Sequence, residues 1–200
     1  VYMVRAPRLE QVEEIYTRLN LVAQGAATMT QTEVEITLDK TCANLIPNTA
    51  LEQVLYGQMC EIEPPKPEER HLSFAGEIAA TLSKPPAGDV LAYRVVPFNG
   101  THMAVPASTD VGDVSWNVPT AQLCVSCYAA GTPEHSWQLV AQGKSEWAHS
   151  GMIYAAKVLA ASAVQLMDAP LILNAAKEEL EKNLQGMEYR KICDVFERNH

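Results

Sequence analysis

The histidines are the first residues that could do chemistry, because an imidazole serves both as a metal ligand and as a general acid or base. Three of the five lie on predicted helices or at the chain end, where surface and packing roles are common: His71, His149 and His200. His102 and His135 lie in predicted loops, where functional side chains concentrate. His135 follows a predicted buried strand at 123–129, and open α/β sheets place their sites beyond the carboxyl ends of such strands. His135 is therefore a candidate ligand or catalytic group, with a surface role as the alternative.

Two aspartates, Asp110 and Asp113, lie in a stretch of small and hydroxyl residues at 108–116. Such a stretch before an acidic turn can present backbone N–H groups to an anion. The alternative is a helix start capped by Thr109 or Asp110. The two interpretations are compatible, since a helix N-terminus itself attracts anions.

Charge and composition exclude several classes of partner. The chain has 15 Lys and Arg against 24 Asp and Glu, a net charge of −9, so no surplus of cations exists to bind a phosphate backbone. The longest apolar stretch, 155–167, is shorter than the roughly 20 residues that span a bilayer and contains polar residues. We expect no nucleic-acid partner, no membrane partner and a cytoplasmic location. Phosphate-binding, dinucleotide-binding and serine-hydrolase motifs are absent from the sequence.

The five cysteines are odd in number and irregularly spaced, which favours free thiols in a reducing compartment. Cys124 and Cys127 form one C-x-x-C motif inside the predicted strand at 123–129. Side chains three residues apart in a strand point to opposite faces. We predict two separate buried thiols there, with a redox or zinc pair as the alternative.

The elements that would position these residues alternate between strand and helix patterns. Strand-like segments lie at 1–5, 32–38, 92–97 and 123–129. Helical segments lie at 8–24, 49–60, 68–82, 145–167 and 171–184. Their expected end signals are Gly25, Ser145 and Pro170. The alternation predicts an α/β fold, and an opening strand at 1–5 suggests a piece of a longer protein.

Three segments, 108–116, 131–136 and 148–157, follow one another as they do in the dinuclear-metal amidohydrolases and carboxypeptidases. The chain resembles this family, which includes carboxypeptidase G, the indole-acetyl amino-acid hydrolases and, closest in appearance, the aminobenzoyl-glutamate utilization proteins of the B type. The resemblance implies a mixed-sheet α/β catalytic domain interrupted by an α/β lid, or dimerisation, domain. On that basis, residues 1–40 would be the second half of the lid, and 41–200 would be the C-terminal portion of the catalytic domain.

The resemblance also implies roles for individual residues. His135 matches the last metal ligand, Arg5 matches the arginine that holds a substrate carboxylate, and Ser108, Thr109 and Asp110 match the segment that faces the substrate. The family's H-x-D ligand pair and acidic general base have no counterpart, because no histidine here is followed by x-Asp. No catalytic residue is therefore assigned to this chain.

The reaction implied for a complete family member is metal-dependent hydrolysis of an N-acyl amino acid amide such as p-aminobenzoyl-glutamate, with zinc or manganese as the metal. We expect this chain alone to be inactive and to bind no metal tightly. The expected partners are a small N-acyl-glutamate-like substrate and either a second copy or a related A-type subunit. The alternative is a non-catalytic dimerisation or interaction module, or a truncated gene product.

Overall fold

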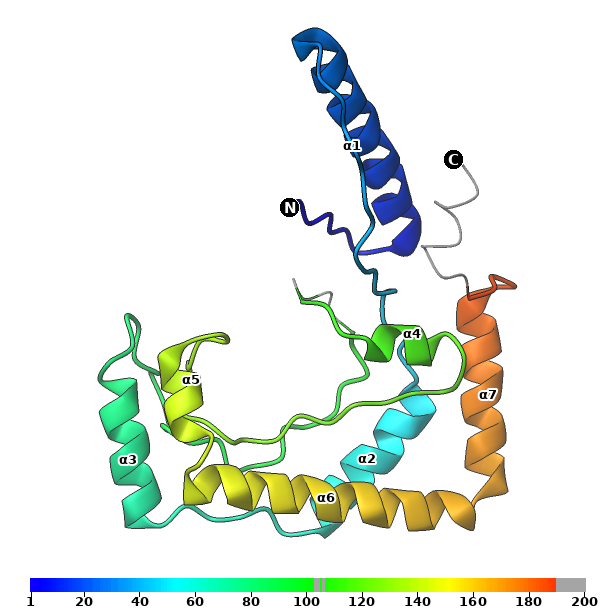
Figure 1. The fold of residues 1–200 in the computed structure, drawn as a ribbon. Helices are drawn as coiled ribbons and strands as arrows, with labels where there is room; N and C mark the ends of the chain where they lie inside the picture. The colour runs from blue at the N-terminus through cyan, green and yellow to red at the C-terminus, as the bar shows by residue number, and fades with distance from the viewer. Residues whose placement is uncertain (103–104, 106, 190–200) are drawn as a thin grey trace. The chain divides into compact units, whose positions relative to one another are not determined.

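The computed structural model describes residues 1–102, 105 and 107–189 (Figure 1). These residues form seven α-helices and no β-strand. In chain order the helices are α1 (Leu9–Thr30), α2 (Thr49–Glu61), α3 (Glu69–Ala79), α4 (Val111–Ser115), α5 (Trp137–Gln142), α6 (Glu146–Met167) and α7 (Pro170–Leu184).

The predicted α/β fold, with its mixed sheet and α/β lid, is wrong for the described residues. The four segments expected to be strands, 1–5, 32–38, 92–97 and 123–129, are irregular. A strand exists only where a second extended segment exchanges backbone hydrogen bonds with it. No backbone–backbone hydrogen bond joins residues 121–127 to another described residue. The side chains there still alternate: Gln122 and Cys124 are exposed, whereas Leu123 and Val125 are half-buried. The segment therefore has the sequence pattern of a strand, but no second described segment pairs with it.

The helix predictions are confirmed, apart from two ends and one omission. Helix α3 ends at Ala79, three residues before the expected end at residue 82. The Ser145 hydroxyl accepts a hydrogen bond from the Ala148 amide at the start of α6, and α7 begins at Pro170. Gly25, the expected end of the first helix, lies inside α1, which continues through five more residues. A glycine costs a helix only about 1 kcal/mol relative to alanine, so good helix formers on both sides outweigh it. Helix α5 was not predicted.

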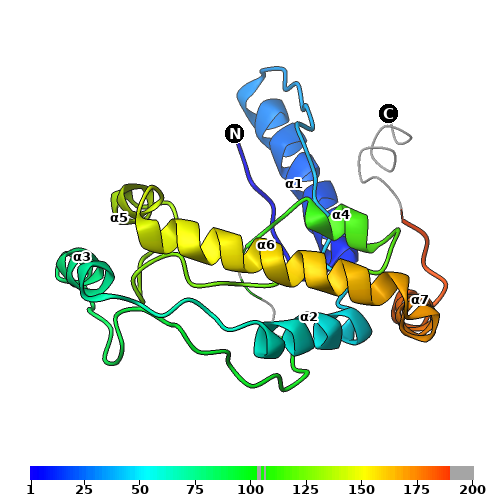
Figure 2. The same cartoon turned by 90° about the horizontal axis from the view of Figure 1, so that it is seen from below.

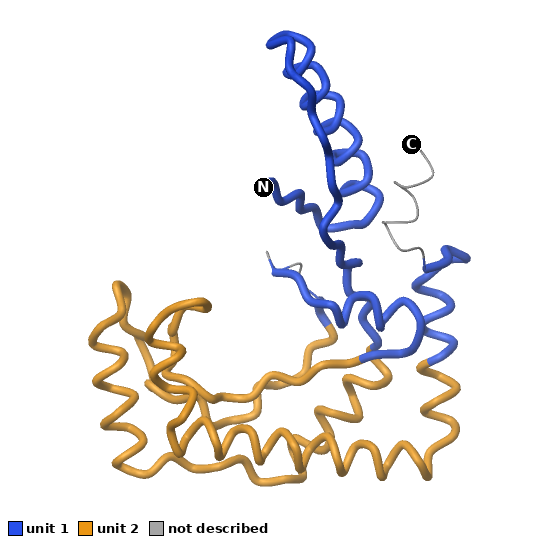
Figure 3. Tube along the Cα trace, in the orientation of Figure 1, with its two compact units in different colours: residues 1–48, 101–120, 177–200 blue, residues 49–100, 121–176 orange. Residues whose placement is uncertain are grey.

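The chain divides into two compact units, each described by itself (Figure 3). Unit 1 contains residues 1–48, 101–120 and 177–200, and unit 2 contains 49–100 and 121–176. The division into residues 1–40 and 41–200 inferred from the resemblance stays a prediction.

The core of unit 1 forms where α4 packs on the segment at 43–46. Ala43, Ile46, Trp116 and Leu180 are buried together there. The Trp116 indole donates a hydrogen bond to the Asn44 carbonyl (2.8 Å), and the Ile46 amide donates one to the Ser115 hydroxyl (2.9 Å). Hence α4 holds this segment through backbone groups as well as apolar contacts.

Gly112 in α4 touches the same segment, and this contact predicts a large effect of a small substitution. A Cβ atom at residue 112 would lie 2.0 Å from the Ala43 carbonyl oxygen, so Gly112→Ala forces the backbone of unit 1 to shift. We expect a loss of about 1–3 kcal/mol in the free energy of unfolding, measured by urea denaturation. Gly25→Ala is the matched control in the same unit, because nothing lies within 4 Å of its added Cβ. It should stabilise α1 by about 0.5–1 kcal/mol. Equal effects of the two substitutions would contradict the packing.

Unit 2 is built around α6, which packs with α2 alongside it (Figure 2). Tyr154 and Val158 of α6 are buried with Leu55 of α2, and the Tyr154 hydroxyl donates to the Met59 carbonyl (2.7 Å). The extended segment at 121–127 also packs on this side of α6. A Cβ at Gly151 would lie 2.5 Å from the Ser126 carbonyl oxygen, so the missing side chain permits this close approach. A second cluster joins Ala75, Ile78, Leu91, Ala129 and Trp147.

Candidate functional site

His135 lies in an exposed turn between the segment that ends at Ala130 and the start of α5. The next residue, Ser136, fixes that start: its hydroxyl accepts from the Leu139 amide (3.2 Å) and donates to the Pro133 carbonyl (2.7 Å). The expected placement of His135 in a loop after 123–129 is correct, although that segment is not a strand.

The backbone of His135 is left-handed, with φ 58°. Two other non-glycine residues of the described chain share this conformation, Gln31 and Gln185, and each directly follows a helix. A left-handed residue commonly ends a helix, which accounts for both glutamines. His135 instead precedes a helix, so helix termination does not explain it. Strained backbone of this kind is concentrated at functional sites.

The described residues do not fit a metal site by themselves. No group of three or more His, Cys, Asp and Glu side chains gathers among them, and a catalytic zinc needs about three protein ligands. His135 could supply one imidazole to a metal, and the other ligands would have to come from elsewhere.

The residues expected to bind substrate lie in unit 1, whereas His135 lies in unit 2. Arg5 is exposed in the irregular N-terminal segment, and its Nε donates to the Met3 Sδ (3.0 Å). Ser108, Thr109 and Asp110 are exposed immediately before α4. Their roles, like that of His135, stay predictions.

The segment at 108–116 has a structural role that the sequence did not reveal. The Thr109 hydroxyl accepts from the Val111 amide (3.3 Å) at the start of α4, so the helix-start interpretation is confirmed. Asp113 Oδ1 accepts from the Ala43 amide (3.1 Å) and from the Tyr189 hydroxyl (3.2 Å). With five residues, α4 is too short for a substantial helix dipole. The residues at 108–116 that resemble the hydrolase family therefore also make packing contacts within unit 1.

A polar cluster at the N-terminus of α6 was missed by the sequence analysis. His71 Nδ1 accepts from the Glu68 amide (3.0 Å), so in the neutral imidazole the proton lies on Nε2, which faces a Glu146 carboxylate oxygen at 3.3 Å. Arg70 Nε lies 3.0 Å from the same oxygen. Arg70, His71 and Glu146 line a cavity of about 360 Å³ that Cys127, Lys144 and Trp147 also border. Both ring nitrogens of His71 are engaged, so the imidazole ties α3 to α6 and is not available as a base.

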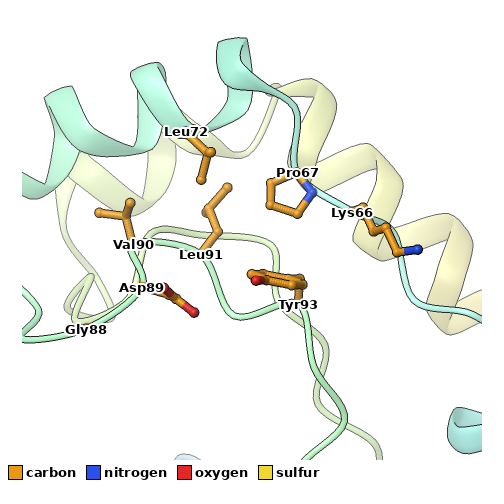
Figure 4. Close-up of a pocket in the computed structure, with 8 residues that line it drawn as sticks. All are labelled: Lys66, Pro67, Leu72, Gly88, Asp89, Val90, Leu91 and Tyr93. Carbon is orange, nitrogen blue, oxygen red and sulfur yellow. The ribbon is translucent and has the colours of Figure 1, made fainter.

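A second hollow in unit 2 is an open groove of about 530 Å³ (Figure 4). Leu72, Pro67 and Leu91 form its apolar wall, and the Asp89 carboxylate lies at its edge. Figure 4 shows the Lys66 side chain directed away from the groove, and its ammonium pairs with Glu63. The Asp89 carboxylate interacts electrostatically with the Arg94 guanidinium. The groove itself offers a ligand an apolar wall and a carboxylate, so it is poorly suited to a glutamate-like substrate.

Cys124 and Cys127 are free thiols in different surroundings. The prediction of two buried thiols is wrong, because Cys124 is exposed and Cys127 is only half-buried. Cys127 faces Gly151 of α6. Burial raises the pKa of the Cys127 thiol.

Because the thiolate is the reactive form, we expect Cys124 to be alkylated faster than Cys127 near pH 8. Raising the pH should narrow the difference between the two alkylation rates, because a larger fraction of Cys127 is then ionised. Peptide mass spectrometry after timed iodoacetamide treatment measures both rates, and a faster Cys127 would contradict the described packing.

Comparison with known proteins supplies the observation that decides the relationship. Over 202 residues the chain is 39% identical to the B-type subunit of p-aminobenzoyl-glutamate hydrolase from Escherichia coli (strain K12). The resemblance to B-type p-aminobenzoyl-glutamate hydrolase subunits is confirmed. The alignment covers 89% of this chain and 42% of the relative, so the chain spans less than half the length of the protein it matches. It corresponds to a C-terminal part of such a protein. No family model and no solved structure matches the chain.

Proposed function

We propose that this chain forms part of a metal-dependent amidohydrolase that cleaves an N-acyl-glutamate amide such as p-aminobenzoyl-glutamate. The observation that carries the proposal is the 39% identity over 89% of the chain to a subunit of p-aminobenzoyl-glutamate hydrolase. Identity at this level over nearly the whole chain supports an amidohydrolase-like role.

Three groups of side chains would serve the reaction. Arg5 would bind a glutamate carboxylate, since a guanidinium pairs with a carboxylate through two parallel hydrogen bonds. His135 would supply one imidazole to zinc or manganese, and 108–110 would face the substrate. The remaining ligands and the general base would come from polypeptide outside this chain. The chain alone should therefore neither hydrolyse the amide nor hold a metal tightly.

The assembly is proposed from the same relationship, whereas the location is proposed from the odd number and irregular spacing of the cysteines. The E. coli relative is named as one subunit of its hydrolase, which indicates that it works in a multi-subunit assembly. We propose that a subunit containing this chain associates with a second copy or with a related A-type subunit, in the cytoplasm.

A non-catalytic interaction module is the second candidate function. The observation that favours it is the apolar, exposed outer side of α6, where Met152, Val164 and Met167 are 57%, 61% and 80% exposed. Such a surface suits a role in assembly whether or not the assembled protein is an enzyme.

The experiment that separates the two candidates is a hybrid subunit, in which this chain replaces the matching region of the E. coli relative. A hybrid that folds, assembles and releases p-aminobenzoate supports the enzyme. A hybrid that folds and assembles without hydrolysis supports the interaction module.

A further inference from the structure

Helix α6 is apolar around most of its circumference, although only one side of it is covered. The inner side carries Trp147, Gly151, Tyr154, Val158 and Ser162, which are all buried. The opposite side, from residue 152 onward, carries Met152, Ile153, Ala156, Leu159, Ala160, Ala163, Val164 and Met167, which are all exposed. We call these eight residues the outer face. A helix that is apolar all round is normally buried on all sides.

The sequence spacing makes the outer face one continuous stripe. Met152, Ala156, Leu159, Ala163 and Met167 recur at steps of four, three, four and four, which place them one above another on the helix. The alanines allow close approach of a partner with large apolar side chains. Lys157 lies at the edge of the outer face, and none of the eight residues of that face is charged. A partner surface that covers the outer face must therefore be apolar and carry few charges.

The segment at 121–127 gives a second reason to expect further polypeptide at unit 2. Its side chains alternate between half-buried and exposed over 121–125, yet none of the backbone groups of 121–127 bonds to another described backbone group. Buried backbone N–H and C=O groups almost always find partners. The segment packs on the inner side of α6, against Tyr154 and Val158, so this observation is independent of the outer face.

We propose that the outer face of α6 is the docking surface for the remaining polypeptide of a p-aminobenzoyl-glutamate hydrolase-type subunit. More than half of the relative's length lies outside the match, so a subunit of that length contains polypeptide that this chain does not. This proposal rests on the proposed function in one respect, which is the identification of the hydrolase subunit as the source of the docking polypeptide. A bilayer is the other apolar surface to test, since α6 is long and apolar enough to cross one by length and composition.

The test is a binding measurement between this chain and the separately produced part of the E. coli subunit that lies outside the match. Calorimetric titration is expected to show association. Leu159→Glu, which places an unpaired charge in the stripe, should weaken binding at least about tenfold. Lys157→Glu, a charge reversal at its edge, should change binding less than about threefold. Because Leu159 is half exposed, the variant should fold; Ala160→Glu is a second variant, and circular dichroism checks both.

Each other outcome overturns the proposal. If the chain dimerises and Leu159→Glu makes it monomeric without any binding to the other part, the occupant is a second copy. If the chain sediments with phosphatidylcholine vesicles and Leu159→Glu releases it, the occupant is a membrane. If folded wild-type chain shows no association, or if all variants bind equally, the outer face is not a docking surface. None of these results depends on hydrolysis, so the proposed activity is tested separately.

Discussion

His135→Gly in the hybrid subunit is expected to abolish hydrolysis of p-aminobenzoyl-glutamate while leaving the fold intact or more stable. The loss should reach about 100-fold or more, as for removal of a catalytic group. The stability expectation comes from the backbone, because His135 has φ 58° and glycine adopts that conformation without strain. Relief of the strain should add up to about 1 kcal/mol to the free energy of unfolding. Initial rates and urea denaturation on the same samples measure both effects.

Gln31→Gly is the matched control for this substitution, because Gln31 has nearly the same backbone conformation, φ 53°, at the end of α1. It should show a similar change in stability with no loss of activity. If His135→Gly and Gln31→Gly have the same effect on rate, the imidazole of His135 has no role in the reaction. A loss of activity that accompanies unfolding would assign His135 to structure.

Arg5→Ala is expected to lower kcat/KM of the hybrid for p-aminobenzoyl-glutamate roughly 30- to 1000-fold. This corresponds to a loss of about 2–4 kcal/mol of transition-state stabilisation. The physical reason is that the glutamate carboxylate would lose a charge-assisted pair. A substrate analogue in which both glutamate carboxylates are amides should be cleaved slowly by the wild-type hybrid. The kcat/KM for that analogue should be almost the same in the wild-type hybrid and in the Arg5→Ala hybrid.

Arg18→Ala controls for the loss of a positive charge from the same unit. Arg18 is exposed on α1 and pairs with Glu14 at 3.5 Å, an exposed ion pair worth little. Its removal should change kcat/KM less than about threefold. If Arg5→Ala slows both substrates to the same degree, Arg5 supports the structure and does not recognise the carboxylate.

The helices were predictable because their signals are local. Ser145 before α6 and Pro170 at the start of α7 act within one turn of the residues they affect, and the apolar spacing of 146–167 needs no distant partner. Helix α5 is six residues long, so it offers too few repeats for a periodic pattern. Ser136 before it and Gly143 after it were the signals available.

The strands were mispredicted because a strand is a property of two segments. Leu123 and Val125 alternate with Gln122 and Cys124 in burial, as the sequence pattern indicates, but no described segment bonds to their backbone. The same limit applies to the site. The loop position of His135 could be predicted, whereas its left-handed backbone and the ties of Asp113 to Ala43 and Tyr189 depend on tertiary contacts.

The most direct measurement of the central claim is the rate of p-aminobenzoate release by the hybrid subunit, supplied with manganese or zinc and with the A-type subunit. The E. coli relative assayed alongside provides the reference rate, and circular dichroism establishes that the hybrid is folded. We predict a rate within about tenfold of the reference, because the hybrid keeps the relative's own residues outside the matched region and the match spans 89% of this chain. A folded, assembled hybrid that releases no p-aminobenzoate would contradict the claim that this chain forms part of such a hydrolase.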